Sequence, residues 1–109
     1  VCSSDLTPRI AEHQMQSGIT YGLTDALLRE LTIQNGAIVE GNFDTYPLMK
    51  ITQMPTVRVH FALAGGEKWG GMGEPATPPA APAMANAVFM ATGKRIRETP
   101  FARQDLSWS

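Results

Sequence analysis

The sequence predicts an α+β fold in which two helices pack on a small mixed or antiparallel sheet. Three observations support this prediction: apolar residues recur at helical spacing near the start, an Asn-Gly pair follows a β-prone run, and an alanine-rich segment ends at a glycine. The expected order is helix, hairpin, strand, loop, helix and tail. With 109 residues and 43% hydrophobic side chains, the chain has the composition of one small globular domain.

The first helix is expected over roughly 11–29. Thr7-Pro8 is a typical helix start, because a threonine hydroxyl can cap the first turn and proline is tolerated where no backbone N–H is needed. Apolar residues then return every three or four positions and form one stripe: Met15, Ile19, Leu23, Ala26, Leu27 and Leu31.

A β-hairpin is expected next, with strands over 31–34 and 37–43. Asn35-Gly36 joins them and favours a type I′ turn, which needs positive φ at both central residues. Alternating residues over 56–63 predict a further strand, after a connection whose X-Pro pairs disfavour helix.

The second helix is expected from about Ala80 to Gly93. Prolines at positions 75, 78, 79 and 82 delay its start, and glycine is the favoured residue just after a helix end. From Lys94 to Ser109 a short strand and a tail are expected.

Composition and charge exclude several classes of function. The net charge is −1, from 9 basic and 10 acidic side chains, so no nucleic-acid partner is expected. No apolar run reaches the roughly 18 residues that a transmembrane helix needs. His13 and His60 stand apart from other potential ligands, and Cys2 is the single cysteine, so we expect no protein-ligated metal and no internal disulfide.

Glu74 is the residue best placed to carry chemistry. The run Gly70 to Gly73 puts this carboxylate directly after a flexible glycine loop and before a helix, where it could act as an acid–base group toward a bulky ligand. The plainer alternative is that Glu74 stabilises the helix N-terminus through the helix dipole.

The stretch from Gly70 to Phe101 reads GGMGEPATPPAAPAMANAVFMATGKRIRETPF. It resembles the C-terminal end of the molybdopterin-binding large subunit of the xanthine dehydrogenase and aldehyde oxidase family, and within that family it looks most like the isoquinoline 1-oxidoreductase beta subunit. The resemblance implies that Glu74 is the catalytic glutamate and that Gly73 contacts the cofactor. It also implies that Met72 and Trp69 border the substrate pocket, although Trp69 is equally consistent with a packing anchor.

The run Gln14 to Leu23, QMQSGITYGL, is similar to the family's glutamine-containing helix, with Ser17 in place of the first glycine of a pair. The resemblance implies that Gln14 and Gly18 contact the cofactor, since an amide can both donate and accept hydrogen bonds. Without the family resemblance, the alternative is that Gln14 is solvated and that the glycines beside it allow close helix packing.

The family's chemistry is the hydroxylation of N-heteroaromatic rings or the oxidation of aldehydes with oxygen from water. The resemblance therefore implies a molybdenum–molybdopterin cofactor, in the cytosine dinucleotide form of bacterial members, whose own dithiolene sulfurs hold the metal. It implies a small partner subunit with [2Fe–2S] clusters, and a substrate that is an aromatic N-heterocycle or an aldehyde. Residues 7–109 would then be an incomplete, C-terminal part of a molybdopterin-binding domain, inactive without the rest of its own large subunit.

A competing hypothesis is a stand-alone α+β binding or structural module whose glycine loop takes a small anion or a partner protein. The two hypotheses make different predictions about the upstream reading frame. The enzyme hypothesis expects it to continue for several hundred residues with further molybdopterin motifs.

Residues 1–6, VCSSDL, are interpreted as a non-native segment translated from a sequencing adapter, because the family resemblance starts only near Glu12. The alternative is a native arm with Ser/Asp turn chemistry. If the segment is non-native, deleting it will change the free energy of unfolding by no more than about 0.5 kcal/mol, the range of neutral surface changes. Chemical denaturation of the two chains measures this, and a larger loss of stability would contradict the interpretation.

Overall fold

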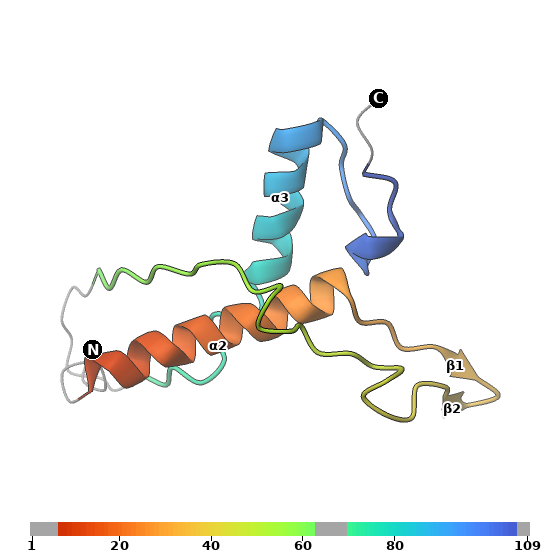
Figure 1. Ribbon diagram of the computed structural model, residues 1–109, viewed down its shortest axis with the longest axis horizontal. Helices are drawn as coiled ribbons and strands as arrows, with labels where there is room; N and C mark the ends of the chain where they lie inside the picture. The colour runs from red at the N-terminus through yellow and green to blue at the C-terminus, as the bar shows by residue number, and fades with distance from the viewer. Residues whose placement is uncertain (1–6, 63–69, 107–109) are drawn as a thin grey trace.

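The computed structural model describes residues 7–62 and 70–106. Its elements, in chain order, are helix α2 (Pro8–Leu27), strands β1 (Ile33–Gln34) and β2 (Ala37–Ile38), helix α3 (Ala80–Thr92) and the 3-10 helix η1 (Phe101–Arg103). The predicted α+β class is confirmed, and the sheet is antiparallel. In Figure 1, α3 stands across α2, and the hairpin lies beyond the C-terminal end of α2.

Helix α2 begins where the Thr7-Pro8 pair predicted. Thr7 occupies the cap position, but its hydroxyl makes no capping hydrogen bond, so that detail of the prediction was wrong. The Thr7 carbonyl accepts hydrogen bonds from the backbone N–H groups of Ile10 (3.0 Å) and Ala11 (3.2 Å). The first turn is therefore closed by backbone bonds and by the fixed φ of proline.

The Asn35-Gly36 turn has the geometry that the sequence predicted, with φ values of 50° and 79°. Each strand is only two residues long, shorter than expected. The Thr32 N–H donates to the Glu40 carboxylate at 2.8 Å, so this donor is used by a side chain outside the strand ladder. The same hydrogen bond lowers the pKa of Glu40 from its ordinary value.

The strand predicted over 56–63 was wrong for residues 56–62, which run as extended chain. This chain continues a segment that returns along α2, and side chains of α2 and of Arg29, just after it, form hydrogen bonds with that segment. These are Arg29 Nε to the Pro47 carbonyl (3.1 Å), the Met49 N–H to Thr24 Oγ1 (3.3 Å), Thr20 Oγ1 to Met54 Sδ (3.0 Å) and Gln16 Nε2 to the Val57 carbonyl (3.5 Å). An extended chain becomes a strand only beside another strand, and none lies there within 7–62 and 70–106.

Helix α3 matches its predicted bounds, and Gly93 ends it with a φ of 72°. The short strand expected after Lys94 was wrong, because the chain turns back toward α2 and forms η1. Phe101 is buried with only 3% of its surface exposed, and Arg103 forms an ion pair with Glu30 just after α2. These two contacts hold the segment against the helix.

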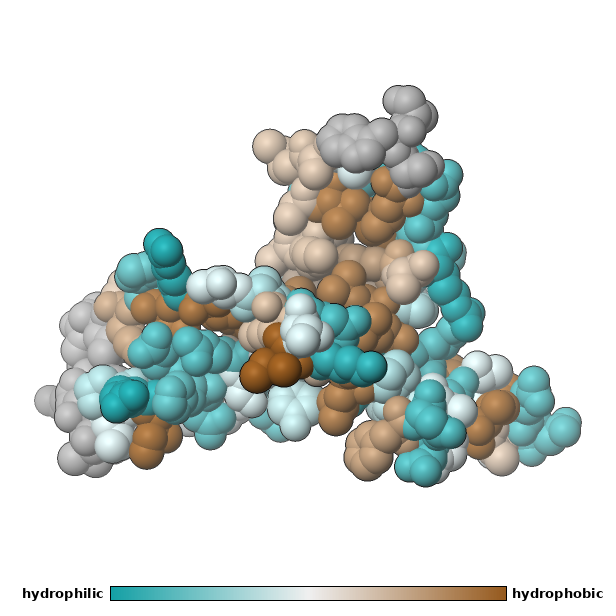
Figure 2. Space-filling model, in the orientation of Figure 1, coloured by the Kyte–Doolittle hydropathy of each residue, from teal (hydrophilic) through white to brown (hydrophobic). Residues whose placement is uncertain are grey.

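The core is small and lies where α2 meets the turn that leads into α3. Within the described ranges the buried apolar side chains include Ala11, Leu23, Ala26, Ala76, Ala80 and Phe101. The radius of gyration is 16.9 Å, against about 13 Å for a compact domain near this length. Apolar residues remain open to solvent, with Ile51 92% and Met90 82% exposed, and Figure 2 shows such residues gathered over α3.

Thr24 is the most deeply buried polar side chain described, at 1% exposure, and it joins two parts of the chain. Its hydroxyl donates to the Thr20 carbonyl (2.7 Å) and accepts from the Met49 N–H (3.3 Å). Thr24→Val keeps the shape but leaves that N–H unpaired, so we expect a loss of about 1–3 kcal/mol in unfolding free energy. Urea denaturation measures it, with the exposed Thr56→Val as a matched control that stays within about 0.5 kcal/mol. Equal changes in unfolding free energy for the two variants would contradict the role of Thr24 in joining these two parts of the chain.

Candidate functional site

Two glycines on one face of α2 allow the segment 76–80 to touch the helix backbone. A Cβ atom on Gly22 would lie 2.4 Å from the Thr77 carbonyl oxygen and 2.6 Å from Ala80 Cβ. A Cβ on Gly18 would lie 2.9 Å from Ala76 Cβ. Both glycines are buried, so the space they leave is filled by the chain itself. Close packing at these glycines, which formed one part of the alternative considered from the sequence, is therefore present, and the packing partner is the segment 76–80.

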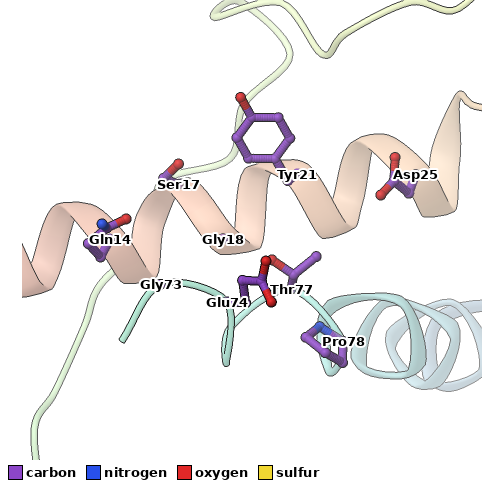
Figure 3. A pocket seen from close by; sticks show the side chains of 9 residues that line it. All are labelled: Gln14, Ser17, Gly18, Tyr21, Asp25, Gly73, Glu74, Thr77 and Pro78. Carbon is purple, nitrogen blue, oxygen red and sulfur yellow. The ribbon is translucent and has the colours of Figure 1, made fainter. Parts of the chain in front are cut away.

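Beside this contact lies a cavity of about 510 Å³ between α2 and the turn before α3. This volume is within the range of about 300–1,000 Å³ typical of small-molecule sites. Its lining residues, labelled in Figure 3, are Gln14, Ser17, Gly18, Tyr21, Asp25, Gly73, Glu74, Thr77 and Pro78.

Four residues singled out from the sequence line this one cavity. Gln14 and Gly18 come from α2, and Gly73 and Glu74 come from the loop on the opposite side. Figure 3 shows the Glu74 carboxylate on the side of the loop that faces α2, next to Thr77. Gln14 and Glu74 are both exposed, so their polar groups are available to a ligand.

Met72 lines a second cavity, of about 250 Å³, that shares Gln14 and Gly73 with the first. Gly70 and Gly71 also line it, and a Cβ placed on either of them or on Gly73 would meet no atom within 4 Å. The loop backbone is therefore open to close approach by a ligand. Trp69, the other predicted pocket residue, lies outside the described residues, as does Cys2.

Sequence reasoning missed the polar residues at the far end of the larger cavity. Tyr21 and Asp25 follow Gln14 at i+7 and i+11, a spacing that places all three on one face of a helix and that could have revealed them. Asp25 Oδ1 accepts a hydrogen bond from Arg29 at 2.9 Å, and the Arg29 guanidinium lies over the Tyr46 ring, 4.5 Å from its centroid. At that end of the cavity, the negative charge of Asp25 is therefore balanced by the Arg29 guanidinium.

The donor set suits an organic ligand. It offers one amide, three hydroxyls and two carboxylates, which together can donate and accept hydrogen bonds along a polar edge. Within 7–62 and 70–106, no group of three or more His, Cys, Asp or Glu side chains could hold a metal ion. Over the same ranges, neither helix combines the length and hydrophobicity that crossing a membrane requires.

Comparison with curated proteins gives several relatives along nearly the whole chain. It is 35% identical over 99 residues to "membrane-bound aldehyde dehydrogenase [pyrroloquinoline-quinone]" of Gluconacetobacter polyoxogenes, covering 91% of this chain and 13% of that protein. It is 30% identical over 93 residues to isoquinoline 1-oxidoreductase subunit beta of Brevundimonas diminuta, covering 85% and 12%. It is 32% identical over 109 residues to a putative xanthine dehydrogenase molybdenum-binding subunit of Escherichia coli, covering 93% and 14%. No family model matches the chain.

The chain spans only about one eighth of the length of these relatives, so it corresponds to a piece of such a subunit. The matches to the aldehyde dehydrogenase and to the Escherichia coli subunit cover 91% and 93% of this chain, so they extend over both Gln14 on α2 and the Gly73-Glu74 loop. The chain belongs to the family of molybdenum-binding subunits of xanthine dehydrogenases and aldehyde oxidoreductases.

Proposed function

We propose that this chain forms part of the molybdenum-cofactor cavity of an oxidoreductase, with Glu74 as its general base. The observation that carries the proposal is that Gln14 and Glu74, far apart in sequence, line one cavity beside the open backbone of Gly73. The family supplies the cofactor class, since its members are molybdenum-binding subunits. The residues present fit a pterin, whose polar edge needs the mixed donors and acceptors found here.

Each of the three residues has a distinct part in this proposal. The Gln14 amide hydrogen-bonds the cofactor's edge and orients it, while Gly73 lets the cofactor approach the backbone. A Glu74 carboxylate oxygen acts as the general base: it accepts the proton of the water-derived hydroxyl group, whose oxygen then attacks the substrate. The cofactor, when bound, supplies the two-electron redox chemistry, and the protein supplies position and proton transfer.

The proposed substrates are small N-heteroaromatic compounds or aldehydes. Relatives are named for isoquinoline, for nicotinate and for aldehydes, which are substrates of these two kinds. Following the family resemblance, we extend the proposal to a cytosine dinucleotide form of the cofactor and to [2Fe–2S] clusters on a small partner subunit that receive the electrons.

The rest of the large subunit is the partner that we propose for the apolar surfaces. A groove of about 580 Å³ between α2 and α3 is lined by apolar residues: Met15, Ile19, Leu23, Pro75, Pro79, Met84 and the four alanines Ala76, Ala80, Ala83 and Ala87. Helix α3 carries no charged residue, and of its side chains only Ala80 is buried. A helix that is apolar on all sides belongs in the interior of a larger protein.

The experiment that tests the proposed function is the substitution of Glu74 in the complete enzyme. Glu74→Gln keeps the shape and removes the base, so turnover will fall by at least about 10²-fold while molybdenum content stays unchanged. Glu74→Asp will also lose most activity, since a displacement near 1 Å can cost about 10²-fold. Steady-state kinetics with metal analysis measures both, and the exposed Glu98→Gln is the matched control.

Near-normal turnover of Glu74→Gln with full metal content would contradict the proposal and favour a glutamate that only stabilises the start of α3. Metal analysis also tests the cofactor itself, because one relative is named for pyrroloquinoline quinone. An active enzyme that contains this quinone and no molybdenum would overturn the cofactor assignment.

Gln14→Ala tests the cofactor contact in the same enzyme. Removing one or two hydrogen bonds that are each worth about 0.5–1.5 kcal/mol will weaken cofactor retention or slow turnover by up to tens of fold. Molybdenum retained after dialysis and the turnover number are the measurements. Gln34→Ala, on the exposed hairpin, serves as the control and leaves both unchanged. If Gln14→Ala also leaves molybdenum retention and turnover unchanged, the proposed contact with the cofactor is excluded.

A further inference from the structure

We propose that Gly22, together with Gly18, is a positioning residue that sets the separation between Gln14 and Glu74. The inference rests on the proposed function for its catalytic consequence, but its geometric part stands on contacts alone. Gln14 and Glu74 lie on opposite sides of the cavity, Gln14 on α2 and Glu74 on the loop. Of the two glycines at which these sides meet, Gly22 leaves less room for a Cβ atom than Gly18.

The contact at Gly22 involves backbone, which makes it difficult to relieve. A Cβ there would lie 2.4 Å from the Thr77 carbonyl oxygen, a distance that real structures essentially never show. The same Cβ would be 2.6 Å from Ala80 Cβ, the last atom of a short, inflexible side chain. Neither neighbour can rotate away, so any side chain at position 22 must displace the segment 77–80 from the helix.

That displacement reaches Glu74 through a short hydrogen-bonded turn. The Thr77 N–H donates to the Glu74 carbonyl at 3.0 Å, and the Ala80 N–H donates to the Thr77 carbonyl at 3.3 Å. The carbonyl that touches Gly22 is therefore part of the turn that holds Glu74. Prolines at 75, 78 and 79 fix φ within this segment, so it moves as a unit and does not absorb the shift locally.

Gly18 makes a second contact of the same kind, one helical turn closer to Gln14. Its virtual Cβ meets a side-chain methyl, Ala76 Cβ at 2.9 Å, with Thr77 Oγ1 next at 3.4 Å. Here the obstacle can be removed by substitution. Ala76→Gly deletes the methyl that a Gly18→Ala side chain would meet, so the double variant moves one methyl from the turn to the helix.

The test combines structure and kinetics on the complete enzyme. In a crystal structure of Gly22→Ala, the distance between the Gln14 amide and the Glu74 carboxylate will increase. Turnover will fall by about 10²-fold, the effect of a displacement near 1 Å, while KM and molybdenum content stay close to those of the unchanged enzyme. A merely structural loss would lower metal content and activity together. Alanine favours helix over glycine, so weaker α2 propensity cannot produce the effect.

Gly18→Ala gives the rescue experiment and carries the test if Gly22→Ala fails to fold. Its turnover will fall less, and Gly18→Ala/Ala76→Gly will recover most of the loss, whereas Ala76→Gly will not rescue Gly22→Ala. Gly41→Ala is the control, because a Cβ there meets nothing within 4 Å.

The outcomes separate this inference from the proposed function. An unchanged separation of Gln14 and Glu74 in Gly22→Ala overturns the inference even if Glu74→Gln is inactive. An increased separation with normal turnover overturns the positioning role as well. An increased separation together with a fully active Glu74→Gln overturns the proposed function and leaves Gly22 as the residue that sets the spacing.

Discussion

The close approach of the segment 76–80 to the backbone of α2 at Gly18 and Gly22 is the contact on which the rest of the structure depends. It joins the two helices, and Ala76 and Ala80, two of the buried apolar residues, lie within it. It also sets the side of the cavity on which Glu74 stands. The glycines are required because the neighbouring atoms leave no room for a methyl group.

Helix α2 serves three parts of the molecule with three faces. One face, through Gln16, Thr20 and Thr24, hydrogen-bonds the segment that returns along it. A second face, with Gly18 and Gly22, packs against the turn before α3. The face that carries Gln14, Tyr21 and Asp25 borders the cavity. Contact with the neighbouring segments, more than a simple apolar stripe, explains why these residues occur where they do.

The open shape is consistent with the place of the chain in a larger subunit. The radius of gyration exceeds that of a compact domain of similar length, and α3 leaves most of its apolar surface uncovered. The chain also spans only about one eighth of its relatives.

The sequence by itself determined the local structure and the family. The Asn-Gly turn, the start of α2 at Pro8 and the end of α3 at Gly93 follow from the conformations that these residues prefer, so they could be predicted residue by residue. The family could be predicted as well, because the segments around Gln14 and Glu74 are distinctive. Gln14 and Glu74, two of the residues that line the candidate cavity, were singled out from these segments.

Only the tertiary structure decided which partners the remaining segments take. The chain over 56–62 has the alternation of a strand, yet it runs beside a helix and bonds to Gln16. The tail follows the burial of Phe101 and the ion pair of Arg103 with Glu30, and so forms η1 where a strand was expected. That Tyr21 and Asp25 line the same cavity as Glu74 likewise depends on the packing of α2 against the segment 76–80. These outcomes depend on which surfaces meet, and alternation within a short segment does not encode the neighbour that it will have.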